Sequence, residues 1–254
     1  MTFDVSGDAY DNFMGRYARE LAPVFADFAG VRSGTALDVG CGSGILTEEL
    51  ASRLGAENVA AADPSPLVTA AASRVPGADV RKAAAEALPW PEASFDAALA
   101  QLVLHFLEDP VAGLVEMRRV TRPGGVVAAS SWNFGEMLLL ATFWKAARSV
   151  VPAAPAETLE MESLDAFADL ARQAGLSEVH GQALDVSTRY ESFDELWGSF
   201  QHSVGPAGQF CASLDPQTRD AIRDEYQRRV GEPDGSFTLT AQAWALRGRV
   251  PESG

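Results

Sequence analysis

Three glycines, Gly40, Gly42 and Gly44, separate two apolar segments of different character, and they constrain the fold more than any other feature of the chain. The preceding segment, 35–39, reads TALDV, which is typical of a short buried strand, whereas 45–54 has apolar residues at helical spacing. Glycines at such a junction allow a tight turn and a close approach of a ligand to the backbone. The free N–H groups that begin the helix would face that ligand. The segment therefore predicts a cofactor loop, with a glycine-rich turn that binds nothing as the alternative.

Two residues distinguish between the cofactors that such a loop could bind. A dinucleotide fingerprint has its third glycine where this chain has Ile45. Asp38 stands just before the loop, and its carboxylate would repel a pyrophosphate but suit a ligand with positive charge. The pattern disfavours NAD, although an NAD-dependent oxidoreductase stays an alternative.

Composition and charge narrow the range of partners. The 254 residues carry a formal charge of −15. Nucleic acids and anionic membranes need basic patches, so we expect neither as the main partner. The two cysteines, Cys41 and Cys211, form neither a disulfide framework nor a metal-ligand spacing, so no metal is expected. We see no signal peptide and no apolar run of the ~18 residues that a membrane span needs, so we expect a cytoplasmic protein.

Downstream of the loop, strand and helix patterns alternate. The expected strands are 58–62, 79–83, 94–101 and 126–131, with helices over 67–74 and 109–121. Such alternation predicts a doubly wound, mostly parallel sheet, in which ligands bind beyond the carboxyl ends of the strands. Gly40, Asp63, Glu86 and Gln101 all fall at those ends, so we expect them to converge on one ligand.

Asp63 allows two interpretations. A carboxylate at the end of the second strand can accept hydrogen bonds from both hydroxyls of a ribose. It could instead cap a helix that the Pro-Ser-Pro sequence 64–66 opens. Further along, Glu86 and Ala87 could present an acceptor beside a backbone N–H, a pair that matches the edge of an adenine ring.

The flanking regions carry further elements. Residues 10–28 have a helical apolar stripe, which Pro23 should interrupt to give two helices or one broken helix. Residues 236–249 alternate between apolar and polar side chains, as a strand does. The other expected elements are helices over 137–151, 163–175, 193–203 and 215–230 and a strand over 176–190.

The motifs, taken in order, resemble the motif set of one protein family. The segments LDVGCGSG, AADPS, AEALPW, FDAALAQLVLHF and RPGG resemble the motif set of class I S-adenosylmethionine-dependent methyltransferases. The small-molecule branch related to quinone biosynthesis, often called type 11, is the most similar, and the resemblance covers about 35–132. It implies a seven-stranded Rossmann-like α/β sheet with a final antiparallel strand inside it. It also implies lid helices over 1–34, a cofactor-binding half over 35–132, and a C-terminal half over 133–254 with a helical cap.

The resemblance implies S-adenosylmethionine as the cofactor and assigns residues to it. The implied cofactor-binding residues are Arg16, Asp38, Gly40, Cys41, Gly42, Gly44, Asp63, Pro64, Ser65, Glu86, Ala87, Gln101 and Phe106. Among them, Asp38 would support the ammonium group and Asp63 would hold the ribose. Arg16 is a candidate for the cofactor carboxylate, with surface exposure as the alternative. Cys41 lies in the loop, and we assign it no chemistry.

The expected reaction is methyl transfer to a small, partly apolar acceptor by in-line displacement. The enzyme would mainly hold donor and acceptor in line. His105 could take a proton from the acceptor, or it could be a packing residue beside Phe106. Aromatic and apolar residues could line the acceptor pocket or belong to the core: Tyr10, Phe13, Met14, Tyr17, Trp132, Phe134, Phe143, Trp144, Trp197 and Phe200. A non-catalytic protein that binds S-adenosylmethionine is the alternative.

Overall fold

The computed structural model describes residues 14–155, 163–201 and 205–252. In these ranges a seven-stranded sheet has the strand order β3-β2-β1-β4-β5-β7-β6. The strands are β1 (Ala36–Val39), β2 (Val59–Ala62), β3 (Asp79–Arg81), β4 (Phe95–Gln101), β5 (Thr121–Trp132), β6 (Ser177–Tyr190) and β7 (Phe237–Arg249). The first five pair in parallel, and β7 lies antiparallel between β5 and β6. The expectation of a mostly parallel sheet with an inserted antiparallel strand is confirmed.

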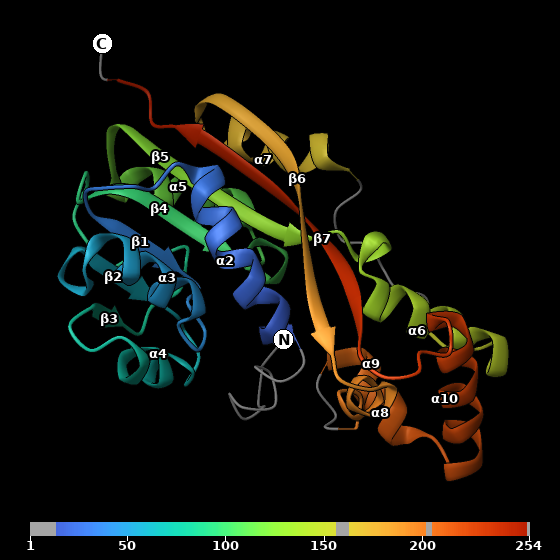
Figure 1. The fold of residues 1–254 in the computed structure, drawn as a ribbon. Helices are drawn as coiled ribbons and strands as arrows, with labels where there is room; N and C mark the ends of the chain where they lie inside the picture. Colours follow the sequence, from blue (N-terminus) through green and yellow to red (C-terminus); the bar gives the residue numbers. More distant parts are fainter. Residues whose placement is uncertain (1–13, 156–162, 202–204, 253–254) are drawn as a thin grey trace.

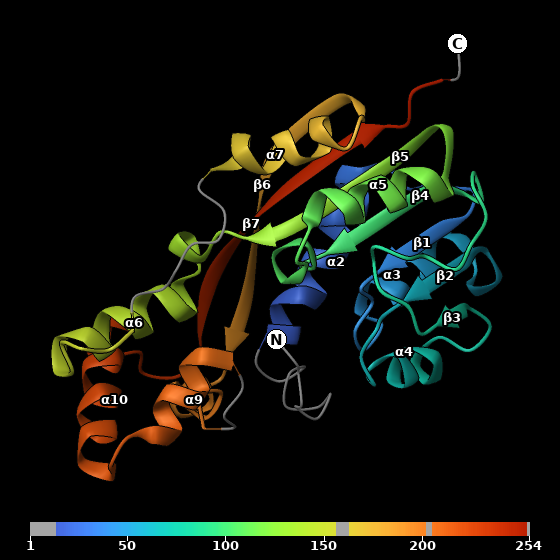
Figure 2. The same cartoon turned by 180° about the vertical axis from the view of Figure 1, so that it is seen from behind.

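Helices cover both faces of the sheet (Figures 1 and 2). The helices are α2 (Arg16–Ala29), α3 (Ile45–Leu54), α4 (Val68–Arg74), α5 (Pro110–Val120), α6 (Leu138–Val150), α7 (Leu164–Gln173), α8 (Phe193–Gly198), α9 (Gly205–Ser213) and α10 (Pro216–Val230). Helices α2 and α3 lie on one face, and α5 and α7 lie on the other. No helix in the described ranges is both long and apolar enough to cross a membrane.

Alternate residues of the central strands enter the two layers of the core. Ala97 and Leu99 of β4 pack on the side of α2, whereas Ala98 and Ala100 pack on the side of α5. Both sets are buried, because a parallel strand in the middle of a covered sheet has no solvent-facing side. This explains why β4 reads as a nearly continuous run of apolar residues.

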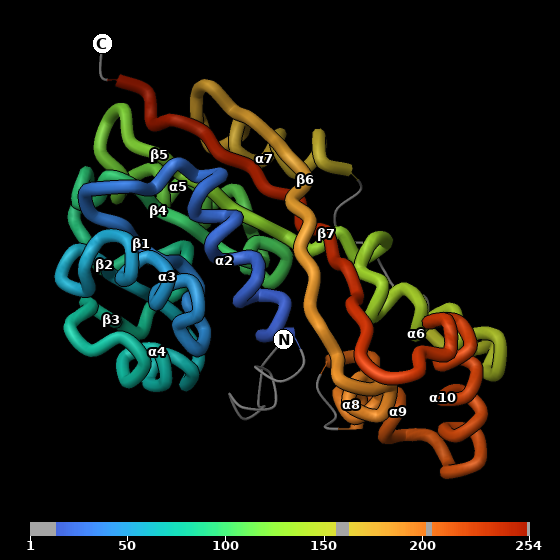
Figure 3. Tube along the Cα trace, in the orientation of Figure 1, coloured from blue at the N-terminus to red at the C-terminus, as the bar shows by residue number. Residues whose placement is uncertain are grey.

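The two longest strands, β6 and β7, extend beyond the parallel part of the sheet. They reach the group of helices α6, α8, α9 and α10, which gathers at one end of the molecule (Figure 3). The arrowheads of β4 and β5 point towards this same end (Figures 1 and 2). The helical group therefore lies towards the edge of the sheet that is formed by the carboxyl ends of the parallel strands.

Three expectations about the elements were wrong. Pro23 does not break the first helix, since α2 runs through it from Arg16 to Ala29. An apolar face with Leu21 and Phe25 fully buried holds that helix in place. The strand expected over 126–131 starts earlier, because β5 begins at Thr121 and includes residues 122–125 as an irregularity of its pairing with β4. The helix expected over 193–203 ends at Gly198, and α9 follows as a separate helix that the sequence pattern did not indicate.

Candidate cofactor and acceptor site

The three loop positions require or allow glycine for different structural reasons. All three have positive φ, at 71°, 51° and 88° for Gly40, Gly42 and Gly44. A Cβ on Gly40 would lie 2.5 Å from Val103, and one on Gly44 would lie 2.9 Å from Ala71. A Cβ on Gly42 would have no described protein atom within 4 Å. Packing therefore requires the first and third glycines, while the second faces open space that a ligand could enter.

Hydrogen bonds fix the loop to the end of β2. The N–H groups of Gly40 and Cys41 both donate to the carbonyl of Ala62, at 2.7 and 3.0 Å. The N–H of Gly42 donates to Oδ2 of Asp63 at 2.8 Å. These hydrogen bonds hold the glycine loop against the carboxyl end of the second strand.

Asp63 is buried, and both of its carboxylate oxygens accept hydrogen bonds. Oδ1 accepts from the Ser65 N–H at 2.8 Å and from the Ser65 hydroxyl at 2.5 Å. Helix α4 begins later, with Leu67 as its N-cap, so the capping alternative for Asp63 is wrong. A carboxylate has about four acceptor positions, and three of them are used inside the chain. One ribose hydroxyl could bind directly, and a second would require the Ser65 hydroxyl to turn away.

Asp38 is a buried carboxyl group held by a threonine. The hydroxyl of Thr47 in α3 donates to Oδ2 of Asp38 at 2.7 Å. Burial raises the pKa of Asp38 to about 7, the Thr47 hydrogen bond opposes this rise, and the charge of Asp63 adds to it. A cationic group beside Asp38 would favour its ionised form. Asp38 is therefore suited to a positively charged ligand.

Gln101, at the carboxyl end of β4, carries an acceptor without a partner. Its Nε2 donates to the carbonyl of Ala18 in α2 at 3.0 Å. Its Oε1 is buried and accepts no hydrogen bond from the described residues. A buried acceptor left in this way is costly unless a ligand donates to it. This orphaned oxygen, the buried Asp38 and the open space at Gly42 all fit the ammonium-bearing part of S-adenosylmethionine.

The expected adenine-reading segment follows β3. Backbone hydrogen bonds from Asp63 N to Arg81 O and from Ala83 N to Asp63 O, at 3.3 and 3.2 Å, place the end of β3 beside that of β2. Glu86 is half-buried in the turn that follows. The N–H of Ala87 donates to Ala84 O at 3.2 Å. For its N–H to contact an adenine ring, Ala87 would therefore have to give up this hydrogen bond. The assignment of Glu86 and Ala87 to the adenine stays a prediction. The assignment of the exposed Pro64 to the cofactor also stays a prediction.

Arg16 lies in the first turn of α2 and is engaged with the C-terminal half of the chain. Its Nη2 donates to Oε1 of Glu195 at 2.7 Å. Its guanidinium also lies 4.4 Å from the centre of the Tyr190 ring. Neither contact uses all five of the guanidinium donors. The role of Arg16 towards a cofactor carboxylate stays a prediction.

The segment after β4 folds back over the loop. Leu102 has a φ of 63°, and its N–H donates to Ser130 O and Oγ at 3.0 and 3.2 Å. The following turn places Nδ1 of His105 3.3 Å from Oγ of Ser131. Phe106, which is 46% exposed, lies against the His105 ring with 3.9 Å between the ring centres. Burial lowers the pKa of His105 to about 4, so its ring is neutral near pH 7.

Most of the expected pocket residues that the structure describes belong to the core. Tyr10 and Phe13 lie outside the described residues. Phe143 and Phe200 stack with 4.4 Å between ring centres, and with Trp144 and Trp197 they are buried in the helical group of α6, α8, α9 and α10. Phe134 differs, because it stands edge-on to His105 at 6.1 Å.

The sequence analysis did not identify two residues that contact the predicted site residues. Thr47 holds Asp38, and Ser131 contacts His105. Thr47 is a fully buried polar residue in α3, which could have been noticed on an otherwise apolar helix face. Ser131 had no such signal, because only the folding back of the segment 102–106 onto β5 brings it to His105.

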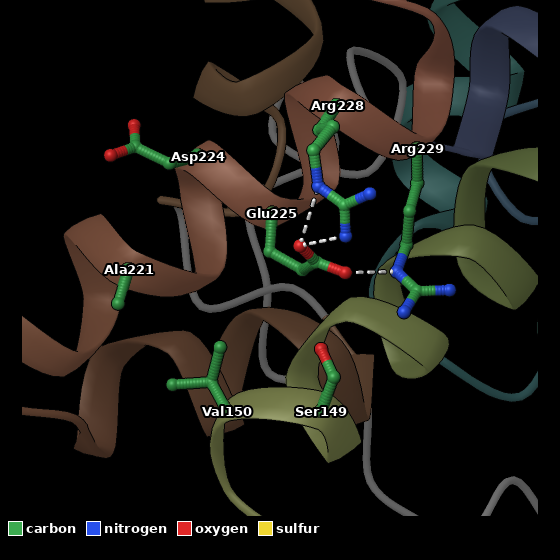
Figure 4. A pocket seen from close by; sticks show the side chains of 7 residues that line it. All are labelled: Ser149, Val150, Ala221, Asp224, Glu225, Arg228 and Arg229. Atoms are coloured by element: carbon green, nitrogen blue, oxygen red, sulfur yellow. Dashed lines mark hydrogen bonds and ion pairs between the residues drawn. The ribbon is translucent and has the colours of Figure 1, made fainter.

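A surface hollow between α6 and α10 lies at the other end of the molecule from α3 (Figures 1 and 4). Its lining includes Arg228 and Arg229, and both arginines are paired with Glu225. None of the expected site residues lines it. We assign no function to this hollow.

Comparisons with known proteins agree with this geometry. Residues 37–129 match a family model described as a methyltransferase domain. The chain is 33% identical over 151 residues to a ubiquinone biosynthesis O-methyltransferase of Cereibacter sphaeroides (strain KD131 / KCTC 12085), covering 56% of this chain and 60% of that protein. It is 36% identical over 152 residues to a demethylmenaquinone methyltransferase of Mycobacterium sp. (strain KMS), covering 56% and 63%. The chain thus spans about three fifths of the length of these curated relatives.

Solved structures share the fold over most of the chain. A putative type II methyltransferase from Anaeromyxobacter dehalogenans superposes with a TM-score of 0.64 at 25% identity, covering 94% of this chain and 98% of that one. The [4+2]-cyclase SpnF superposes with a TM-score of 0.57 at 20% identity, covering 92% and 82%. The fold alone therefore does not identify a reaction.

The order of the strands, the glycine loop and the superposition with solved structures define this chain as a Rossmann-like α/β protein with the methyltransferase fold. Within it, the match to the methyltransferase-domain model spans residues 37–129. The match over 37–129 supports the resemblance to methyltransferases, and two of the curated relatives have names from quinone biosynthesis.

Proposed function

We propose that this protein transfers a methyl group from S-adenosylmethionine to a small, partly apolar acceptor. One observation carries the proposal: the hydrogen bond from Gly42 to Asp63 joins two strand ends beside a buried Asp38. This combination suits a ligand with a nucleoside at one end and a cationic group at the other. The family match over 37–129 supports the same cofactor.

The chain's own residues would bind and orient the reactants. Asp63 would accept from the ribose, while Asp38 and Gln101 Oε1 would stabilise the ammonium group. When bound, S-adenosylmethionine supplies a methyl group already activated on a sulfonium. Holding donor and acceptor in line can contribute about 7–11 kcal/mol to lowering the barrier. A metal ion is not needed for this displacement, and we propose none.

We propose a hydroxylated aromatic ring, such as a hydroquinone, as the acceptor class. The curated relatives are named for the biosynthesis of ubiquinone and for demethylmenaquinone, both of which are quinones. Near the carboxyl ends of β4 and β5, aromatic Phe106 and Phe134 flank the polar His105. An aromatic ring that carries oxygen atoms matches such a surface, which has apolar walls and one polar group.

Binding and turnover are tested separately. Isothermal titration calorimetry should show binding of S-adenosylhomocysteine and no comparable binding of NAD. Incubation with S-adenosylmethionine and either 1,4-dihydroxynaphthalene or catechol should then give a methylated product and S-adenosylhomocysteine, both detected by mass spectrometry. Binding without product across phenol, amine and thiol acceptors would favour the non-catalytic alternative. Preferential binding of NAD would refute the proposal.

A further inference from the structure

The contact between Ser131 and His105 defines which ring nitrogen carries a proton. Ser131 is 1% exposed, and its hydroxyl lies 3.3 Å from Nδ1 of His105. Within the described parts of the chain, this nitrogen is the one hydrogen-bond partner of the hydroxyl. A buried hydroxyl hydrogen without an acceptor is unfavourable. The Nδ1 lone pair is the acceptor available to it, so the serine donates and Nδ1 carries no proton.

The remaining proton of the neutral ring then belongs to Nε2. A neutral imidazole has one donor and one acceptor nitrogen, and the partner of one nitrogen sets the state of the other. Burial, which lowers the pKa of His105, keeps the ring in this neutral form. No described residue accepts a hydrogen bond from Nε2. A protonated nitrogen without a partner is available as a donor to a ligand.

The surroundings place this donor next to the proposed cofactor site. Val103 packs so closely on Gly40 that a Cβ there would lie 2.5 Å away, so the segment carrying His105 covers the glycine loop. Phe106 and Phe134 flank the imidazole, one tilted against it and one edge-on. A ligand ring that packs against the exposed side of Phe106 could then meet the imidazole N–H with an oxygen atom on its edge.

We propose that Ser131 fixes His105 as a hydrogen-bond donor at Nε2, and that this donor selects acceptors with a carbonyl, phenol or phenolate oxygen. His105 then orients the acceptor and does not remove its proton, because a nitrogen that carries a proton cannot act as the base. Ser131 is a positioning residue that acts through His105. This inference rests on the proposed function and makes its acceptor class more specific.

Nuclear magnetic resonance tests the protonation state without any turnover. Long-range ¹H–¹⁵N correlation on the full-length labelled chain shows which nitrogen of each imidazole is protonated. The chain has three histidines, and the spectrum of His105→Gln assigns the His105 signals. We expect a protonated Nε2 in the parent protein and a mixture of both forms in Ser131→Ala. A protonated Nδ1 in the parent would overturn the inference, whether or not the protein transfers methyl groups.

A matched pair of variants tests the donor role, with 1,4-dihydroxynaphthalene as the acceptor probe. Glutamine can place an amide nitrogen near the position of Nε2, whereas asparagine reaches only the position of Nδ1. We expect His105→Gln to keep KM within about threefold of the parent value. In His105→Asn, KM should rise about tenfold with a smaller change in kcat, the effect of one lost hydrogen bond.

The contrary result is equally distinct. If both variants lose kcat to the same extent at unchanged KM, His105 transfers a proton, and the donor role is wrong. If the parent protein binds S-adenosylhomocysteine but does not methylate the probe, the proposed acceptor class fails. The tautomer measurement then still decides whether Ser131 fixes the ring.

Discussion

The backbone N–H of Gly42 donates a hydrogen bond of 2.8 Å to Oδ2 of Asp63, which lies 21 positions further along the chain. This contact joins the loop after β1 to the end of β2. It fixes the loop at the glycine where a side chain would have open space around it. We therefore expect the two residues to contribute jointly to the binding of any ligand at this place, and they can be tested together.

We predict that Asp63→Ala weakens both folding and ligand binding. The variant leaves the N–H groups of Gly42 and Ser65 without their acceptor, which should lower the free energy of unfolding by about 1–3 kcal/mol. Affinity for S-adenosylhomocysteine, measured by calorimetry, should fall at least about tenfold, because losing a charged acceptor costs about 1.5–3 kcal/mol.

Asp96→Ala is the matched control for this variant. Asp96 accepts from the Thr35 N–H at 2.7 Å, but it lies at the amino-terminal end of β4, away from the glycine loop. The Asp96→Ala variant should lose stability to an extent similar to that of Asp63→Ala, and it should keep its affinity for S-adenosylhomocysteine. Equal losses of affinity in the two variants would contradict the assignment of Asp63 to the site.

Alanine substitutions of the loop glycines should separate folding from binding. Gly40→Ala places a Cβ 2.5 Å from Val103, and Gly44→Ala places one 2.9 Å from Ala71, so both should lose stability by overpacking of about 1–3 kcal/mol and by backbone strain. Gly42→Ala carries only the cost of a positive φ, about 1–2 kcal/mol. Its Cβ enters the open space instead.

Denaturation and calorimetry check this series. Gly42→Ala should remain the most stable of the three variants and should bind S-adenosylhomocysteine much more weakly than the parent. An unchanged affinity in Gly42→Ala would show that the ligand does not approach this glycine.

Asp38 should make stability depend on pH. Its pKa is about 7 in the folded protein against an ordinary value of 3.8. Between these values the folded chain holds a proton that the unfolded chain has lost, so the free energy of unfolding should fall as pH rises from about 4 to 7. Asp38→Asn should remove this contribution. Urea denaturation of both proteins at pH 5 and pH 8 measures the difference, which we expect to be on the order of a few kcal/mol.

The same ionisation should control ligand affinity in the opposite direction. A cationic group binds better to the ionised carboxylate, so affinity for S-adenosylhomocysteine should rise between pH 6 and pH 8. Thr47→Val removes a hydrogen bond that favours the ionised form and should shift this rise to higher pH. A pH profile that is the same in the parent and in Asp38→Asn would refute the role of Asp38.

Arg16 and Glu195 should differ in their effect on binding, although they form one ion pair. Both side chains are partly exposed, so we expect each substitution to change stability by no more than about 1 kcal/mol. Arg16→Ala should weaken binding of S-adenosylhomocysteine, if the guanidinium also reaches the ligand carboxylate. Glu195→Gln, which leaves the arginine in place, should not. Calorimetry that shows equal effects would assign Arg16 to holding α2 against α8 only.

Much of the parallel half could be predicted because its signals are local. The strand before Gly40, the glycine loop and α3 are encoded in one continuous segment, and the alternation over 236–249 correctly indicated β7. The continuity of α2 through Pro23 could not be predicted. The helix is held by the burial of Leu21 and Phe25 in the core, which outweighs the lost backbone hydrogen bond.

The sequence by itself determined the chain's class of fold and the strand ends at which the predicted cofactor-binding residues stand, because glycine spacing and apolar periodicity are properties of neighbouring residues. Only the tertiary structure decided that Thr47 holds Asp38, that Arg16 pairs with Glu195, and that Ser131 contacts His105. The latter two pairs join residues from distant parts of the chain, and in all three the contact depends on how elements pack. That packing shifts the pKa values of Asp38 and His105, on which the proposed chemistry of the site depends.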